Sequence, residues 1–132
     1  MPTHVRPDVV ERWHHIVEHG DEAALDDLIA DDAVFYSPAV FTPQEGKALT
    51  LAYLRAALAV FTGRDFRYVG EWYSDGSAVL EFTADLDGIH VDGIDMMHWN
   101  DAGQITSFKV MIRPVKGLHA LMPLMATQLG QS

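Results

Sequence analysis

The hydrophobic periodicity of this chain changes near residue 65, from a helical spacing to a strict alternation. Upstream of that point, apolar residues recur every three or four positions, which is typical of amphipathic helices. Downstream, Leu80, Phe82 and Ala84 alternate with polar residues, which is typical of a strand with one buried face. An apolar sheet face must be covered, so helices followed by strands predict an α+β fold.

The first part of the chain is expected to form helices over residues 7–19, 21–29 and 47–61. Gly20 stands where a glycine commonly ends a helix, and Asp21 can cap the helix that follows. Ala33 to Tyr36 has the composition of a short strand, which Ser37-Pro38 would end. These signals together place two helices, a strand and a third helix before the change of period.

Turn signals divide the second part of the chain into four neighbouring strands. They lie at Asp75-Gly76, Asp87-Gly88 and Asn100–Gly103. The segment from Asp65 to Arg113 is therefore expected to form a four-strand antiparallel meander. Residues 115–132 are expected to form a C-terminal tail helix, because their apolar residues return to helical spacing.

Composition favours a single domain over residues 1–132 and excludes several kinds of partner. The 19 acidic and 9 basic side chains give a net charge of −10, which disfavours nucleic acid and anionic membranes. The chain has no cysteine, so it can form neither a disulfide nor a zinc–thiolate site. It has no glycine-rich phosphate loop and no zinc motif, so we expect neither a cofactor nor a metal.

The location expected for this chain is the cytoplasm. Its longest apolar stretches, Ala56–Phe61 and Leu118–Met125, are too short to span a bilayer. The first residues contain no apolar segment of the kind that secretory signals carry.

Asp95 breaks the hydrophobic pattern of the strand expected over 89–99. The alternation places Val91, Asp95 and Met97 on the inner face of this strand, and His90 and His98 on the outer face. A carboxylate on an apolar face must find hydrogen-bond donors or stay protonated, and such groups are enriched at functional sites. A purely structural hydrogen bond to a neighbouring helix is the alternative interpretation.

The order of these elements resembles the nuclear transport factor 2-like superfamily, which includes SnoaL-like polyketide cyclases, ketosteroid isomerases and limonene-epoxide hydrolases. The resemblance covers residues 7–113 and is carried by Gly20-Asp21…Ser37-Pro38, Glu45-Gly46-Lys47…Tyr53-Leu54 and Gly93-Ile94-Asp95…Gly103-Gln104-Ile105. It implies a cone-shaped α+β barrel, with about three N-terminal helices packed in a curved mixed or antiparallel sheet. It also implies a deep apolar pocket and a homodimer formed through the outer face of the sheet.

The resemblance assigns roles to individual residues. Asp95 falls at the position of the protonated aspartate with which ketosteroid isomerases donate a hydrogen bond to the reacting oxygen. Trp13 replaces the oxyanion tyrosine of those enzymes, and Ser37 replaces their general base. Val110 lies near the acidic residue of the cyclases and hydrolases. Asp95 is therefore the one residue expected to act in catalysis.

The residues expected to line the pocket are Trp13, Ser37, Tyr53, Phe82, Met97, Trp99, Phe108 and Val110. Phe66, Trp72 and Met111 are expected near it. Two hypotheses follow. The pocket binds a small, mostly hydrophobic molecule and supports an isomerase-, cyclase- or hydratase-like step with Asp95 as hydrogen-bond donor. Alternatively, the chain is a non-catalytic dimeric ligand-binding or interaction domain with a degenerate active site.

A general base is not evident from the sequence, and the weak candidates are Tyr53, Tyr36 and His14. His15 and His19 have a spacing that can hold a metal, but an exposed helix face is the favoured interpretation. His90, Asp92 and His98 are expected on the outer sheet face, where a dimer partner would lie.

Overall fold

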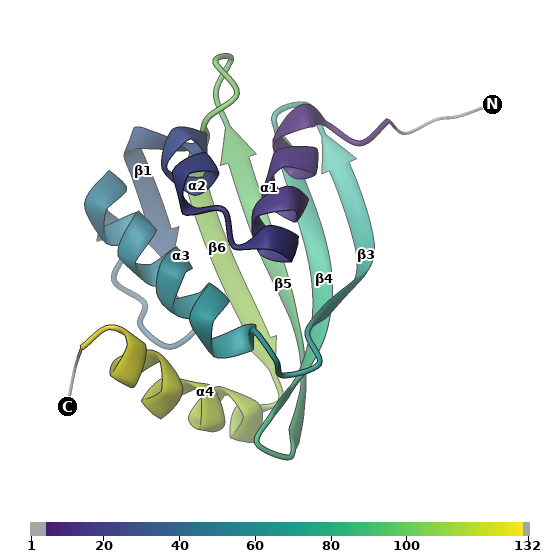
Figure 1. Ribbon diagram of the computed structural model, residues 1–132, viewed down its shortest axis with the longest axis vertical. Coiled ribbons are helices and arrows are strands. Elements are labelled where there is room, and N and C mark those ends of the chain that lie inside the picture. The colour runs from purple at the N-terminus through teal and green to yellow at the C-terminus, as the bar shows by residue number, and fades with distance from the viewer. Residues whose placement is uncertain (1–4, 131–132) are drawn as a thin grey trace.

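The computed structural model describes residues 5–130 and has the α+β architecture expected from the sequence (Figure 1). Three helices precede the meander and one follows it. In chain order the elements are α1 (Asp8–His19), α2 (Glu22–Leu28), β1 (Ile29–Tyr36), β2 (Gln44–Glu45), α3 (Lys47–Phe61), β3 (Arg67–Ser74), β4 (Ser77–Leu86), β5 (Ile89–Trp99), β6 (Ile105–Arg113) and α4 (Val115–Gln128). No helix within residues 5–130 is long and apolar enough to cross a membrane.

One six-stranded sheet, in the order β2-β1-β6-β5-β4-β3, forms the wall of the molecule. The pairs of the meander are antiparallel, as the turn signals predict, whereas β1 runs parallel to β6. The sheet is curved and mixed, but it stays open, with β2 and β3 at its edges. The expected barrel is therefore an open cone whose concave side holds the helices (Figure 1).

The residues predicted to end α1 and to cap the start of α2 do so in the structure. Gly20 has a left-handed φ of 64°, and its N–H donates to the carbonyl of Ile16. The Asp21 side chain accepts a hydrogen bond from the N–H of Ala24 at 3.0 Å. The prediction that Ile29 belongs to the second helix is wrong, because this residue begins β1 and pairs with Ile105.

The buried side chains form two clusters on the concave side of the sheet. The larger cluster joins α1, α2 and part of α3 to the sheet and contains Trp13, Leu80, Met97 and Phe108. The smaller cluster lies where α4 packs against the sheet and contains Leu86, Val91 and Leu121. Helix α4 runs across one end of the cone beside α3 (Figure 1). The space between the two clusters is where a cavity can open.

A β-bulge in β3 decides which of its side chains face the helices. Tyr68 pairs with Phe82, but the register shifts before Gly70, and Glu71 then pairs with Leu80. Tyr68 and Glu71 therefore share the concave face, which strict alternation does not allow. The expectation that Trp72 lies near the pocket is wrong, because the bulge turns it to the convex face, where it is 58% exposed.

Candidate functional site

A cavity of about 680 Å³ opens between the helices and the concave face of the sheet. Its walls are mainly apolar and include side chains from α1, α3, α4 and the strands. Several residues expected at the pocket line this cavity: Trp13, Ser37, Tyr53, Phe66, Phe82, Asp95, Phe108 and Val110. This volume suits a small organic ligand, since such sites commonly occupy about 300–1,000 Å³.

Besides Trp72, three residues expected at or near the pocket lie elsewhere. Met97 is fully buried in the larger core cluster, and Trp99 packs against the same cluster. Helix α1 fills the space in front of this end of β5, since Val9 and Val10 belong to that cluster. Met111 faces the convex side of the sheet and is 48% exposed.

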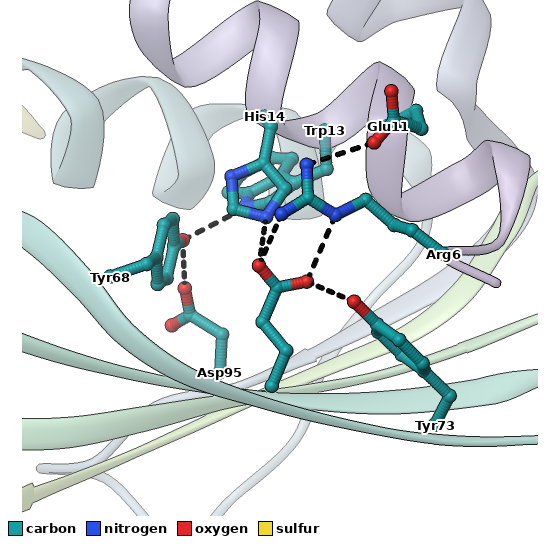
Figure 2. Close-up of polar contacts among 8 residues, drawn as sticks. Arg6, Glu11, Trp13, His14, Tyr68, Tyr73 and Asp95 are labelled. Atoms are coloured by element: carbon teal, nitrogen blue, oxygen red, sulfur yellow. Dashed lines mark hydrogen bonds and ion pairs between the residues drawn. The ribbon is translucent and has the colours of Figure 1, made fainter. Parts of the chain in front are cut away.

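Asp95 lies on the cavity wall at the middle of β5, with a residue exposure of 6%. It is paired with Leu80 on one side and Val110 on the other, so its strand neighbours are apolar. The hydroxyl of Tyr68 donates to Asp95 Oδ2 at 2.5 Å, and Trp13 Nε1 donates to the Tyr68 oxygen at 2.8 Å (Figure 2). Asp95 Oδ1 has no hydrogen-bond partner among residues 5–130, so it is available to a molecule in the cavity.

Burial controls the protonation of this group. It raises the pKa of Asp95 from the ordinary value of 3.8 to about 7, although the hydrogen bond from Tyr68 acts in the opposite direction. Burial and the neighbouring Asp95 also raise the pKa of Tyr68 well above its ordinary value, so Tyr68 stays neutral. At neutral pH a large share of Asp95 is protonated and can donate a hydrogen bond to a ligand oxygen.

A second polar group, centred on Glu71, lies beside this chain of hydrogen bonds. Arg6 donates to both Glu71 oxygens, at 2.7 and 3.1 Å, and Tyr73 donates to Oε1. His14 Nε2 lies 3.0 Å from Glu71 Oε2, and its ring meets that of Tyr68 edge-on at 5.1 Å between centroids. Figure 2 shows Arg6, His14 and Tyr73 converging at this point. The group ties the N-terminal segment and α1 to β3.

Glu71 is held ionised by these neighbours. Burial raises the pKa of Glu71, but the hydrogen bond from Tyr73 and the charges of His14 and Arg6 outweigh it, and the pKa is lowered overall. The negative charge of Glu71 in turn contributes to the raised pKa of Tyr68. Neither Tyr68 nor Glu71 is identified from the sequence. Alternation from Phe66 puts Tyr68 on the inner face without singling it out, and the bulge after Tyr68 hides that Glu71 shares this face.

The other candidate residues have simpler environments. Ser37 Oγ accepts hydrogen bonds from the N–H groups of Ala39 and Val40, at 3.0 and 3.3 Å, so it stabilises the loop beside the cavity. Of the three residues considered as bases, Tyr53 lines the cavity, while Tyr36 and His14 do not. Tyr53 stacks on Phe35 with 5.0 Å between ring centroids.

The other histidines within residues 5–130 lie outside the cavity. The His15 ring stacks on His19 at 4.5 Å and approaches Asp21 at 3.3 Å, on the exposed side of α1. No group of three or more metal-ligating side chains occurs within residues 5–130. His90 and His98 are exposed on β5, as the alternation predicts.

Glu18 is a second carboxylate at the cavity, and no sequence pattern selects it. It lies near the end of α1, is exposed to solvent, and lines the cavity beside Val17. It forms no ion pair with any residue in the described range 5–130. Its position five residues after Trp13 is about 140° around the helix from that residue, so helical spacing does not mark it as a cavity residue.

Comparisons with known proteins agree with this architecture. A model of the SnoaL-like domain family matches residues 10–108. A steroid delta-isomerase from Pseudomonas aeruginosa is similar over 92% of this chain and 89% of its own, with 36% identity and a TM-score of 0.86. An uncharacterised protein with a cystatin-like fold from Silicibacter pomeroyi is similar over 92% and 84%, with 28% identity and a TM-score of 0.83.

A nuclear transport factor 2-like protein of unknown function from Cytophaga hutchinsonii shares the fold at 18% identity, with a TM-score of 0.62 over 89% of this chain and 99% of its own. No curated protein matches the chain.

Proposed function

This chain belongs to the SnoaL-like domain family of the nuclear transport factor 2-like superfamily, and from that premise we propose that its cavity binds a small, mostly hydrophobic carbonyl compound and isomerises it. The family resemblance expected from the sequence is thereby confirmed. Fold alone does not assign a reaction, so the proposal depends on the cavity. The similar steroid delta-isomerase suggests the reaction class, a shift of a carbon–carbon double bond next to a ketone.

The observation that carries the proposal is the chain of hydrogen bonds Trp13–Tyr68–Asp95 at the wall of an apolar cavity. Removal of a proton beside a ketone places negative charge on the ketone oxygen. Fixed donors in a water-poor site stabilise such an oxyanion far better than they would in water. Protonated Asp95 supplies that donor, and Tyr68, held between Trp13 and Asp95, keeps the carboxyl group oriented.

The apolar walls provide the binding energy and hold the rest of the ligand. Phe82 and Phe108 are almost fully buried, at 1% and 2% exposure, and both line the cavity. Phe108 packs against Trp13 with 4.9 Å between ring centroids, which keeps the indole close to Tyr68. A flat, apolar ligand with one oxygen is complementary to these walls, since it leaves few polar groups without partners.

The test is turnover of a β,γ-unsaturated ketosteroid, followed by the ultraviolet absorbance of the conjugated product. We expect wild type to be active and Asp95→Ala to lose about 10²- to 10³-fold in kcat, the usual cost of removing one oxyanion donor. Asp101→Ala, an exposed change in the turn after β5, is the matched control and should retain full activity. Equal rates for wild type and Asp95→Ala would contradict the role of Asp95.

A second candidate function is binding without catalysis. It is favoured by Ser37, which stands where the resembling isomerases carry their general base, and by apolar Val110. Binding of a saturated ketosteroid, measured by quenching of tryptophan fluorescence, separates the two candidates. A wild type that binds this ketone tightly but does not turn over the unsaturated one would favour the binding domain.

We further propose a homodimer through the convex face of the sheet. Trp72 and Met111 are exposed there at 58% and 48%. Met111 pairs with Ile94 of β5, and Trp72 is aligned with Met96 of β5 across the intervening strand β4. Exposed apolar residues that adjoin each other commonly mark an interface. Light scattering should give a dimer for wild type at micromolar concentration and a monomer for Met111→Glu. Val115→Glu, at an exposed position on α4, should remain dimeric; a monomeric wild type would refute the proposal.

A further inference from the structure

We propose that Glu18 is the general base of this site and carries the proton between the two carbon atoms of the substrate. The assignment rests on the proposed isomerase function. It fills the role that Ser37 leaves vacant, since a serine hydroxyl without a partner base is a poor proton acceptor near neutral pH. It also assigns a role to a cavity carboxylate that forms no ion pair in residues 5–130.

Few side chains of the cavity could accept a proton from a substrate. Among the described residues, the carboxylates and phenols that line it are Glu18, Tyr53, Tyr68 and Asp95. Tyr68 and Asp95 are hydrogen-bonded to each other and serve the oxygen side of the reaction. Tyr53 is a phenol, which is a weak proton acceptor while neutral. Glu18 is then the remaining carboxylate, and carboxylates act as bases for this type of proton transfer.

Glu18 is displaced along α1 from the residues that would bind the ketone oxygen. Trp13 and Glu18 lie on the same helix, five residues apart, which separates them by about 7.5 Å along the helix axis and by about 140° around it. A bound ketone must place its oxygen against the Trp13–Tyr68–Asp95 chain and its reacting carbon against the base. A contact of about 3 Å at the ketone oxygen and another at the reacting carbon, added to the bonds between these two atoms, span a distance similar to the axial separation of Trp13 and Glu18.

The two carboxyl groups of the cavity, Asp95 and Glu18, lie in contrasting environments. Asp95 is buried among apolar residues, whereas Glu18 is exposed to solvent at the end of α1. A pair of acids in different environments allows one to donate while the other accepts. The long, unpaired side chain of Glu18 can also turn to reach two carbon atoms in succession, which a base that moves a proton must do.

The proposed step conserves every atom and electron. A Glu18 carboxylate oxygen takes a proton from the carbon between the ketone and the double bond. The electron pair of that C–H bond moves toward the ketone oxygen, which becomes a dienolate oxygen stabilised by Asp95. Protonated Glu18 then delivers the same proton to the far carbon of the former double bond. The C=O bond re-forms, the double bond is now conjugated with it, and Glu18 is again a carboxylate.

The experiment compares wild type with Glu18→Gln, Glu18→Asp and the control Glu45→Gln. Glu45 is an exposed residue of β2 that does not line the cavity. We expect Glu18→Gln to lower kcat by about 10²- to 10⁴-fold, the range associated with general bases. The Kd of Glu18→Gln for a saturated ketosteroid should differ from that of wild type by less than about threefold, because Gln has nearly the same shape as Glu. Glu18→Asp should recover part of the rate, and Glu45→Gln should match wild type.

The outcomes separate this assignment from the function on which it rests. An active wild type whose Glu18→Gln variant keeps its kcat overturns the assignment alone. A wild type that binds the ketone without isomerising it overturns the proposed function and the assignment together. Loss of rate in Glu18→Gln with equal loss of ketone binding also overturns the assignment, because the residue would then act on binding.

Discussion

Replacing Asp95 with asparagine is expected to stabilise the protein relative to wild type by an amount that grows between pH 4 and pH 8. The folded state holds the Asp95 proton up to a pKa of about 7, whereas the ordinary value is 3.8. Between these values the folded state binds more protons than the unfolded state, so raising the pH lowers the free energy of unfolding of wild type. The full difference between the two pKa values corresponds to a loss of about 4 kcal/mol in the free energy of unfolding of wild type. Asparagine does not ionise and avoids this loss.

The measurement is urea-induced unfolding of wild type and Asp95→Asn at pH 4, 6 and 8. The difference between their free energies of unfolding should rise through this series and level off above pH 7. Asp101→Asn, in an exposed turn, is the matched control and should follow wild type at each pH. A difference that does not change with pH would show that Asp95 titrates in its ordinary range, and would remove the basis for a neutral donor in the cavity.

Gly93→Ala is expected to destabilise the protein by about 1–3 kcal/mol and to weaken ligand binding, because the site has no room for a methyl group. A Cβ at position 93 would lie 2.6 Å from the ring of Phe82 and 2.7 Å from the carbonyl oxygen of Met111. The carbonyl belongs to the backbone of β6 and cannot rotate away. The bare backbone of Gly93 is therefore what allows the Phe82 ring to pack at the cavity wall.

A double-mutant cycle with Phe82→Leu tests the cause of this effect. Thermal unfolding of the two single variants and the double variant gives the coupling between positions 82 and 93. We expect Gly93→Ala to destabilise the Phe82→Leu background less than it destabilises wild type. Some loss of stability should remain, since the Met111 carbonyl is still in place. A Gly93→Ala variant as stable as wild type would show that β5 and β6 separate easily at this point.

The position of Asp95 could be predicted because β5 is uninterrupted. Its pairing with β4 runs from Ile89 to His98 without a shift, so alternation along the strand correctly divides its two faces. The same argument fails on β3, where one extra residue between Tyr68 and Gly70 reverses the faces. Glu71 is consequently predicted on the wrong face. Tyr68 precedes the bulge, and nothing local marks it as the direct partner of Asp95.

Glu18 shows a different limit of sequence reasoning. Its helix and its place on that helix are predictable, yet nothing nearby in the chain distinguishes it from the exposed acids around it. It becomes notable only because α1 packs so that this end reaches the cavity. Met97 and Trp99 illustrate the converse, since the inner face of β5 is predicted correctly but core packing takes these two side chains out of the cavity.

The elements of this protein can be predicted from its amino-acid sequence: helices before residue 65, a meander after it, and a carboxylate on the inner face of the third meander strand. These features depend on residues a few positions apart, whose spacing, turn glycines and caps act locally. Tertiary packing sets the parallel pairing of β1 with β6, the bulge that puts Glu71 on the same face as Tyr68, and the approach of Glu18 to the cavity. Such contacts join distant segments, and their free energy is not encoded in any short stretch of the chain.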